Sequence, residues 1–262
     1  MSNKTSSTRH NLSSTVQSVD RAIRVLEVLA HDGEAGVTQL ATELGVHKST
    51  AFRLVSALEA GDLVEQDSAR GKYRLGMGIL RLAGATTARL DVVQESRPLA
   101  LELARELEET VNIVVLHEGA ALYLDQLTGS SVLPSHNWVG QRIPLHATSN
   151  GKVLLSGLSP EQIRKVVGRR LRAYTPATIT NVRTLLDQVE RVREQGHALV
   201  VDELEVGLTA VAAPLRNTHG DVVASLSVSG PSFRFDDALT GRATERVVAT
   251  AAEVSRRLGW RT

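Results

Sequence analysis

Apolar residues between Val37 and Leu63 recur at helical spacing and predict two short helices joined by a tight turn. Thr38 is expected to cap the first helix, and Gly45 stands where a glycine with positive φ ends a helix. The second helix is predicted over His47–Ala60, because its apolar positions follow the i, i+3, i+4, i+7 pattern of one buried stripe. That stripe consists of Ala51, Leu54, Val55 and Leu58.

The opposite face of this second helix is rich in hydrogen-bond donors and has no carboxylate before Glu59. A helix that buries one side and offers hydroxyls and arginine on the other suits the major groove of DNA. The hydroxyls and Lys48 would bind phosphate, and Arg53 would reach a guanine edge. An ordinary helical hairpin with a solvated polar face has the same pattern, so this stretch alone leaves both interpretations open.

The residues that follow favour DNA binding. Val64–Gln66 and Tyr73–Leu75 are predicted as short strands around a polar turn, and basic residues lie on the turn and the returning strand. Two helices followed by a basic hairpin are the layout of a winged helix, whose wing contacts phosphates or the minor groove. The candidate DNA contacts are Thr38, Gln39, Lys48, Ser49, Thr50, Phe52, Arg53, Arg70, Lys72 and Arg74.

Composition limits the class of protein. The 262 residues suffice for two domains, and the net charge of +1 does not itself indicate a nucleic-acid partner. The absence of cysteine excludes disulfides and thiolate metal sites. There is no apolar run of membrane-spanning length and no hydrophobic signal-peptide core at the polar N-terminus. These features predict a soluble cytoplasmic protein without membrane contact.

Four segments are expected along the chain. Residues 1–15, rich in Ser and Thr, are predicted to be a disordered tail, and 16–75 form the winged helix, beginning with a helix that Ser18 caps. Residues 76–92 are predicted as a linker helix that pairs with its copy in a dimer, and 93–262 as a second domain. This second domain should open with a helix over Val93–Glu109, whose first turns are kinked or start later because of Pro98.

The second domain alternates strand and helix patterns, which predict an α+β fold with a mostly antiparallel sheet flanked by helices. The expected strands are Asn112–His117, Leu122–Gln126, Ala198–Asp202, Thr209–Leu215 and Val222–Val228, with Trp138–Arg142 as a loop or strand end. The expected helices are Ser149–Ser156, one beginning at Ser159-Pro160-Glu161-Gln162, Asn181–Gln195 and Asp236–Leu258.

Three polar segments stand among these strands. The start of the short helix at Ser149 and Asn150 offers hydroxyl, amide and backbone N–H groups that suit a carboxylate. The strand over Ser225–Ser229 places its serines on one face, which either lines a small-ligand pocket or is exposed to solvent. The acidic connection over Asp202–Leu208 is either a source of acid/base groups or, as we expect, solvated. Lys152 either meets a ligand carboxylate or, as we expect, lies at the surface.

No catalytic or metal site is expected. The acidic residues have no nucleophile–base pair at suggestive spacing, although an enzyme whose chemistry sits in the second domain remains an alternative. The histidines show no ligand spacing, and we expect His146 to be structural, with its ring bonded to a nearby backbone carbonyl. Neither a metal nor another cofactor is therefore predicted.

Six short motifs occur in order along the chain. They are VDRA from Val19, KSTAFRL from Lys48, YRLG from Tyr73, PLHATSNGK from Pro144, GLTAVAAP from Gly207 and SVSGP from Ser227. With these motifs at family spacing across both domains, the chain resembles the IclR family of bacterial transcriptional regulators, from about Val16 to the C-terminus.

The resemblance implies an N-terminal winged helix and a C-terminal GAF-like effector domain. It also implies dimers or tetramers that bind operator DNA and respond to a small organic acid or aromatic compound. Carried over by position, the effector contacts are Ser149, Asn150, Leu208, Ala210, Ser227 and Ser229, with Ile143 as an apolar wall. Val200 and Ala210 replace an aspartate and a cysteine of a family member that binds a small keto acid, so that side of the pocket should be less polar.

The expected function is that of an effector-responsive transcriptional regulator, and we expect a repressor rather than an activator. A ligand-independent, architectural DNA binder is a further alternative. It would be favoured if Ser227 and Ser229 faced solvent with no cavity behind them.

Overall fold

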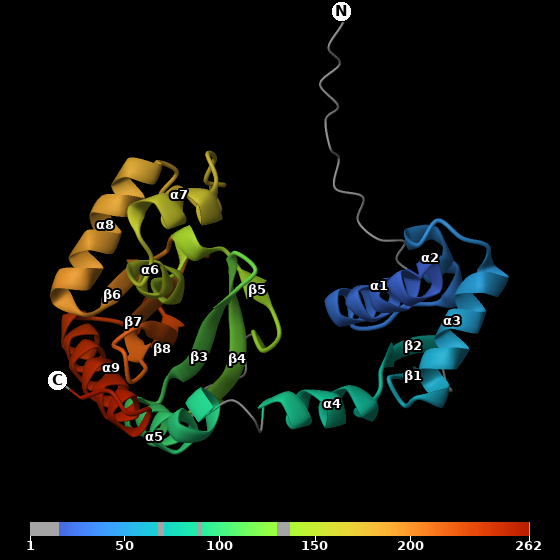
Figure 1. The fold of residues 1–262 in the computed structure, drawn as a ribbon, viewed down its shortest axis with the longest axis horizontal. Coiled ribbons are helices and arrows are strands. Elements are labelled where there is room, and N and C mark those ends of the chain that lie inside the picture. Colours follow the sequence, from blue (N-terminus) through green and yellow to red (C-terminus); the bar gives the residue numbers. More distant parts are fainter. Residues whose placement is uncertain (1–15, 68–70, 88–90, 130–136, 262) are drawn as a thin grey trace, which may run out of the picture. The chain divides into compact units, whose positions relative to one another are not determined.

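The structure, a computed structural model, describes residues 16–67, 71–87, 91–129 and 137–261 (Figure 1). The chain forms two compact units, residues 1–86 and 87–262, which are described separately. The predicted tail at 1–15 and the candidate DNA contact Arg70 lie outside the described residues.

The N-terminal unit has three helices, a two-stranded antiparallel hairpin and a further helix. Its elements are α1 (Gln17–Asp32), α2 (Val37–Glu43), α3 (Lys48–Ala60), β1 (Val64–Asp67), β2 (Lys72–Leu75) and α4 (Met77–Thr87). The buried stripe of α3 packs with α1 and α2, and Tyr73 of the hairpin joins the same core. This arrangement confirms the predicted winged helix.

Two predicted helix caps are wrong. Gly36 is the N-cap of α2 and Val16 that of α1, so Thr38 and Ser18 lie inside the first turns of their helices. The start of α2 is set by a β-bridge between Ala35 and Tyr73. The backbone N–H group of each residue donates to the carbonyl oxygen of the other at 2.9 Å. This pairing keeps the chain extended up to Gly36, where the helix begins. Gly45 has φ +61°, which confirms the predicted glycine after α2.

The helix predicted over the linker corresponds to α4, and the next described helix includes Asp91; residues 88–90 lie outside the described residues. Gly76 and Gly78 set the start of α4 against the loop after α3. A Cβ at Gly76 would lie 2.4 Å from the Asp62 carbonyl oxygen, and one at Gly78 would lie 2.6 Å from it. The Gly78 N–H donates to the same oxygen at 2.8 Å, so both glycines permit a backbone approach that a side chain would block.

The C-terminal unit is built on a six-stranded sheet in the order β5-β4-β3-β8-β7-β6, with every neighbouring pair antiparallel. The strands are β3 (Thr110–His117), β4 (Ala120–Thr128), β5 (Arg142–Ile143), β6 (Ala198–Val201), β7 (Leu208–Arg216) and β8 (Val222–Pro231). The predicted α+β fold is confirmed.

Helices cover both faces of this sheet (Figure 1). On one face α5 (Asp91–Leu107) and α9 (Asp237–Arg257) enclose one apolar core with β3, β7 and β8. On the other face lie a 3₁₀ turn η1 (Leu145–Ala147), α6 (Ser149–Ser156), α7 (Pro160–Val167) and α8 (Val182–Gln195), which enclose a second core. None of the helices in the described ranges has the length and apolar character needed to cross a membrane.

The helix ends of this unit mostly follow the predicted caps. Ser159 and Gln162 form a complete capping box around Pro160, and Asn181 and Asp236 cap α8 and α9 with their side chains. The start of α5 differs from the prediction. It begins at Asp91 and continues through Pro98, where one backbone hydrogen bond is lost. Packing of the following turns into the core offsets that loss.

Candidate functional site

The first candidate site is the exposed face of α3. Lys48, Ser49, Phe52 and Arg53 are exposed there, Thr50 is half-buried, and Phe52 retains 53% of its accessible surface. The opposite stripe is buried in the core, so α3 cannot turn this face inward. On α2, Thr38 and Gln39 are exposed as well. The helix that was predicted to enter the major groove thus has an exposed face of polar residues, with Phe52 among them.

The basic residues of the hairpin are paired with carboxylates. Lys72 Nζ lies 2.7 Å from Glu34 Oε1, and Arg74 Nε lies 2.6 Å from Glu65 Oε1. Exposed pairs of this kind contribute about 0–1 kcal/mol, and a DNA phosphate competes with them at small cost. Among the described residues of the hairpin, Lys72 and Arg74 are therefore exposed but neutralised by neighbouring carboxylates.

The second candidate site is a cavity in the C-terminal unit, between the sheet and α6, with an empty volume of about 430 Å³ including its mouth. Of the predicted effector contacts, Ser149, Asn150, Leu208, Ala210, Ser227 and Ser229 line it. Ile143 does not line it but packs with Tyr123 in the adjoining core.

Asn150 organises the polar wall of the cavity. Its Oδ1 accepts a hydrogen bond from Ser225 Oγ, and its Nδ2 donates to Ser227 Oγ at 2.9 Å and to Tyr123 Oη at 3.3 Å. Ser225 and Ser227 are completely buried. The row of serines on β8 therefore faces the interior, which decides between the two alternatives left by the sequence.

The start of α6 is fixed by close backbone packing. Thr148 caps the helix, with its Oγ1 accepting from the Gly151 N–H at 3.0 Å. A Cβ at residue 151 would lie 2.1 Å from the Leu145 carbonyl oxygen, so only glycine lets α6 rest on η1 in this way. This contact directs Ser149 and Asn150 at the cavity.

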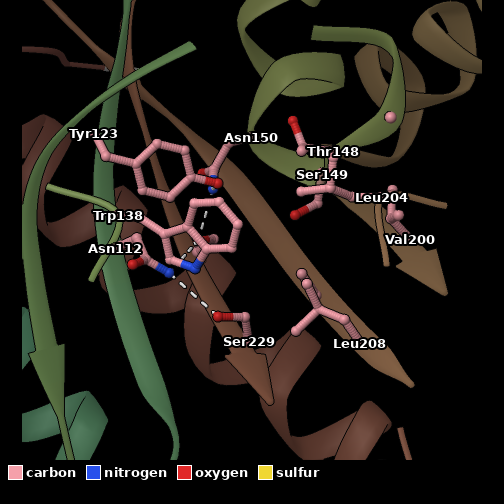
Figure 2. A pocket seen from close by; sticks show the side chains of 13 residues that line it. Asn112, Tyr123, Trp138, Thr148, Ser149, Asn150, Val200, Leu204, Leu208 and Ser229 are labelled. Atoms are coloured by element: carbon pink, nitrogen blue, oxygen red, sulfur yellow. Dashed lines mark hydrogen bonds between the residues drawn. The ribbon is translucent and has the colours of Figure 1, made fainter. Parts of the chain in front are cut away.

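The cavity has one aromatic and one aliphatic wall (Figure 2). Tyr123 and Trp138 stand on one side with ring centroids 6.1 Å apart, and Val200, Leu204 and Leu208 stand on the other. Burial raises the pKa of Tyr123 to about 12, so the phenol remains neutral. A slot between rings and branched side chains suits a flat or slender apolar group.

Several lining residues escaped the sequence analysis. They are Asn112, Tyr123, Trp138, Ala147, Thr148 and Leu204. Asn112 and Tyr123 come from neighbouring strands, and the alternation of β4 would have placed Tyr123 on a buried face but not at a cavity. Val200 and Ala210 line the cavity too, so the wall at these positions is apolar.

Two predictions about charged residues in this unit are wrong. Lys152 is not at the surface but 1% exposed, with Nζ 2.5 Å from Glu203 Oε1, and Glu203 in the acidic connection is buried as well. Burial lowers the pKa of Lys152, and the nearby Glu203 carboxylate opposes this shift. His146 was predicted to be structural, and its Nε2 lies 2.9 Å from the Arg172 carbonyl oxygen, which confirms that prediction.

The chemistry of the cavity suits binding rather than turnover. Every described residue that lines it is neutral, with hydroxyl and amide groups among apolar walls. General acid–base catalysis needs a titratable group with a pKa near the working pH. The described lining offers only the phenol of Tyr123, whose pKa lies far above that range.

Comparison with known protein families finds a matching family model for each of the two units. Residues 18–68 match the model described as "IclR helix-turn-helix domain", and residues 84–256 match "Bacterial transcriptional regulator IclR C-terminal". The chain is 39% identical to the HTH-type transcriptional regulator Rv1719 of Mycobacterium tuberculosis, over 94% of this chain and 92% of that protein. It is 33% identical to the HTH-type transcriptional repressor AllR of Escherichia coli K12, over 93% and 90%.

A solved structure extends the comparison. An IclR homologue from Microbacterium hydrocarbonoxydans, complexed with 4-hydroxybenzoate, superposes with a TM-score of 0.80 at 25% identity, covering 92% of this chain and 98% of that one. These relatives are transcriptional regulators, so the enzyme alternative is set aside. The chain belongs to the IclR family of bacterial helix-turn-helix transcriptional regulators.

Proposed function

We propose that this regulator is an effector-responsive repressor that binds operator DNA as a homodimer or homotetramer and is controlled by a small organic acid or aromatic metabolite. The observation that carries the proposal is the neutral cavity under α6, which has apolar walls and a polar wall already assembled by Asn150. A repressor relative, AllR, supports the sign of regulation.

The acid end of the effector binds at the start of α6. There Ser149 Oγ is buried and has no hydrogen-bond partner among the described residues, and the positive end of the helix dipole favours an anion. The Tyr123 and Trp138 rings supply a wall for a ring or a slender chain. A homologue of similar fold has been solved with 4-hydroxybenzoate, a small aromatic acid.

The DNA contacts are the exposed residues of α2, α3 and the hairpin. Arg53 reads a base edge, the hydroxyls and Lys48 hold phosphate, and two copies of α3 engage the two half-sites of an operator. Effector binding tightens the second unit and changes the spacing of the two recognition helices through the linker. A protein with this activity works in the bacterial cytoplasm.

A ligand-independent architectural DNA binder is less well supported. That alternative requires Ser227 and Ser229 to face solvent with no cavity behind them. Ser227 is completely buried, Ser229 is half-buried, and both line the cavity.

The test is genome-wide capture of fragmented host DNA by the purified protein, with Arg53→Ala as the control. Discrete captured sites that disappear with Arg53→Ala support the proposal, and the genes beside them indicate candidate effectors. Capture of the same sites by Arg53→Ala, or no sites with or without candidate acids, would contradict it.

A further inference from the structure

Asn112 lines the cavity and has a buried side-chain oxygen that no described residue satisfies. The residue lies on β3 opposite Ser227 of β8, and its side chain is 2% exposed. Its Nδ2 donates to Ser229 Oγ at 3.2 Å and to Ser227 Oγ at 3.4 Å. Its Oδ1 has no hydrogen-bond partner among the described residues, although buried carbonyl oxygens normally have one.

A second unsatisfied group stands across the cavity. Ser149 Oγ, at the start of α6, is also buried without a partner in the described ranges. Figure 2 shows the two residues on different sides of the cavity, with Asn112 beside Ser229 and Ser149 beside Thr148. The Ser149 hydroxyl can donate or accept, and it donates to a carboxylate, whereas Asn112 Oδ1 can only accept and therefore needs a donor on the ligand.

The neutral lining restricts which donor fits. An ammonium group next to Asn112 would be buried without a carboxylate, because each described lining residue is uncharged. A hydroxyl group donates one hydrogen bond at no such cost. The site therefore favours hydroxy acids over amino acids.

We propose that Asn112 determines effector specificity by accepting a hydrogen bond from a hydroxyl group of the effector, so that the effector is a hydroxylated carboxylic acid. This inference rests on the proposed function, which places the carboxylate at α6. The analogue without the hydroxyl then binds with lower affinity, because its binding excludes water from Asn112 Oδ1 and leaves this acceptor without a hydrogen bond.

The experiment is isothermal titration of the full-length protein with two matched sets of acids. One set is benzoate, 4-hydroxybenzoate and 4-methoxybenzoate, and the other is propionate, 3-hydroxypropionate and 3-methoxypropionate. The expected result is at least tenfold tighter binding of a hydroxylated acid than of its parent and its methoxy ether. In Asn112→Leu this preference should fall to less than twofold.

Two further variants keep the test decisive. Val223→Leu changes an exposed residue of β8 that does not line the cavity, so it should retain the hydroxyl preference. If Asn112→Leu does not fold by circular dichroism, Asn112→Ala replaces it, since the measured quantity is a ratio of affinities and a general weakening cancels.

The outcomes separate this inference from the function on which it rests. Equal binding of hydroxylated and parent acids, or a preference that survives in Asn112→Leu, overturns the role of Asn112 and leaves an acid-responsive regulator. A preference for the methoxy ethers means that the amide offers its N–H groups and also overturns it. No binding of any acid in either set overturns the acid-effector proposal and this inference together.

Discussion

Lys152 Nζ lies 2.5 Å from Glu203 Oε1 in the interior of the C-terminal unit, with the lysine side chain 1% exposed and the glutamate side chain 9% exposed. The pair joins α6 to the connection between β6 and β7. Both elements also line the cavity, through Asn150 on α6 and Leu204 in the connection. The ion pair therefore holds together two walls of the candidate effector site.

Removing one partner of this pair should destabilise the protein strongly. Lys152→Met leaves the Glu203 carboxylate buried without a counter-charge, which typically costs about 3–5 kcal/mol of unfolding free energy. The double variant Lys152→Met with Glu203→Leu removes both charges and should recover most of that loss. Urea unfolding measures all three proteins.

The matched control is the exposed pair of Arg142 and Glu118, whose side chains are 49% and 65% exposed. Glu118→Gln should change the unfolding free energy by less than about 1 kcal/mol. A loss of similar size at Glu118 and at Lys152, or a double variant less stable than Lys152→Met, would show that the buried pair has no special role.

Glu109 makes the unfolding free energy of the protein depend on pH. The side chain is completely buried, with Arg234 Nε 2.9 Å from Oε1 and the Gly230 backbone packed against the carboxyl group. Burial raises the pKa of Glu109, Arg234 lowers it by a smaller amount, and Glu108 raises it further. The folded protein thus binds this proton more tightly than the unfolded chain does.

The stability contributed by protonated Glu109 is fully present below the ordinary glutamate pKa of 4.5 and is lost as the pH rises through the higher folded-state value. Glu109→Gln mimics the protonated form, so it should be more stable than the native protein at pH 7 and equal to it near pH 4. Thermal unfolding between these pH values measures the difference. A Glu109→Gln variant that is less stable at pH 7 would mean that the Arg234 attraction outweighs burial.

The periodicity of the chain predicted most helices and strands, because helices such as α1, α3 and α8 have one buried face and strands such as β4 alternate between buried and partly exposed positions. The helix starts at Ser159, Asn181 and Asp236 were readable because each depends on a side chain a few residues from the atoms it binds. The start of α2 was not readable. It depends on the pairing of Ala35 with Tyr73, which lie far apart in the sequence.

The candidate cavity shows the same limit. The residues at α6 and β8 came from motifs, whereas Asn112 and Tyr123 reach it through the register of β3 with β8 and β4. The burial of Lys152 was also hidden, because a lysine on a short helix is normally exposed and its partner Glu203 is distant in the sequence. A local sequence pattern does not show which distant residue a side chain will contact.

Arg53 should contribute to sequence-specific DNA binding. It is exposed on the free face of α3, and an arginine that reads a guanine edge contributes about 1–3 kcal/mol of discrimination. Arg53→Ala should weaken binding to a captured operator by that amount and relax specificity at one base position. Fluorescence anisotropy with the operator and single-base variants measures it.

The matched control for Arg53 is Lys165→Ala, which removes one exposed positive charge from α7 in the other unit. It should leave operator affinity nearly unchanged. If Arg53→Ala weakens binding to all sequences equally, Arg53 contacts phosphate rather than a base.

Ser227→Leu should separate effector response from DNA binding. The substitution fills the cavity beside Asn150 and removes the acceptor of its Nδ2 group, so no acid should bind there. α3 lies in the other unit, and operator affinity should stay within about twofold of the native value, a difference of about 0.4 kcal/mol. The readouts are operator affinity by anisotropy and its change on adding the acid that binds tightest in the titrations.

Val223→Leu, an exposed change on the same strand, is the control and should respond normally. A Ser227→Leu protein that folds, by circular dichroism, and still responds to the acid would place the effector site outside this cavity.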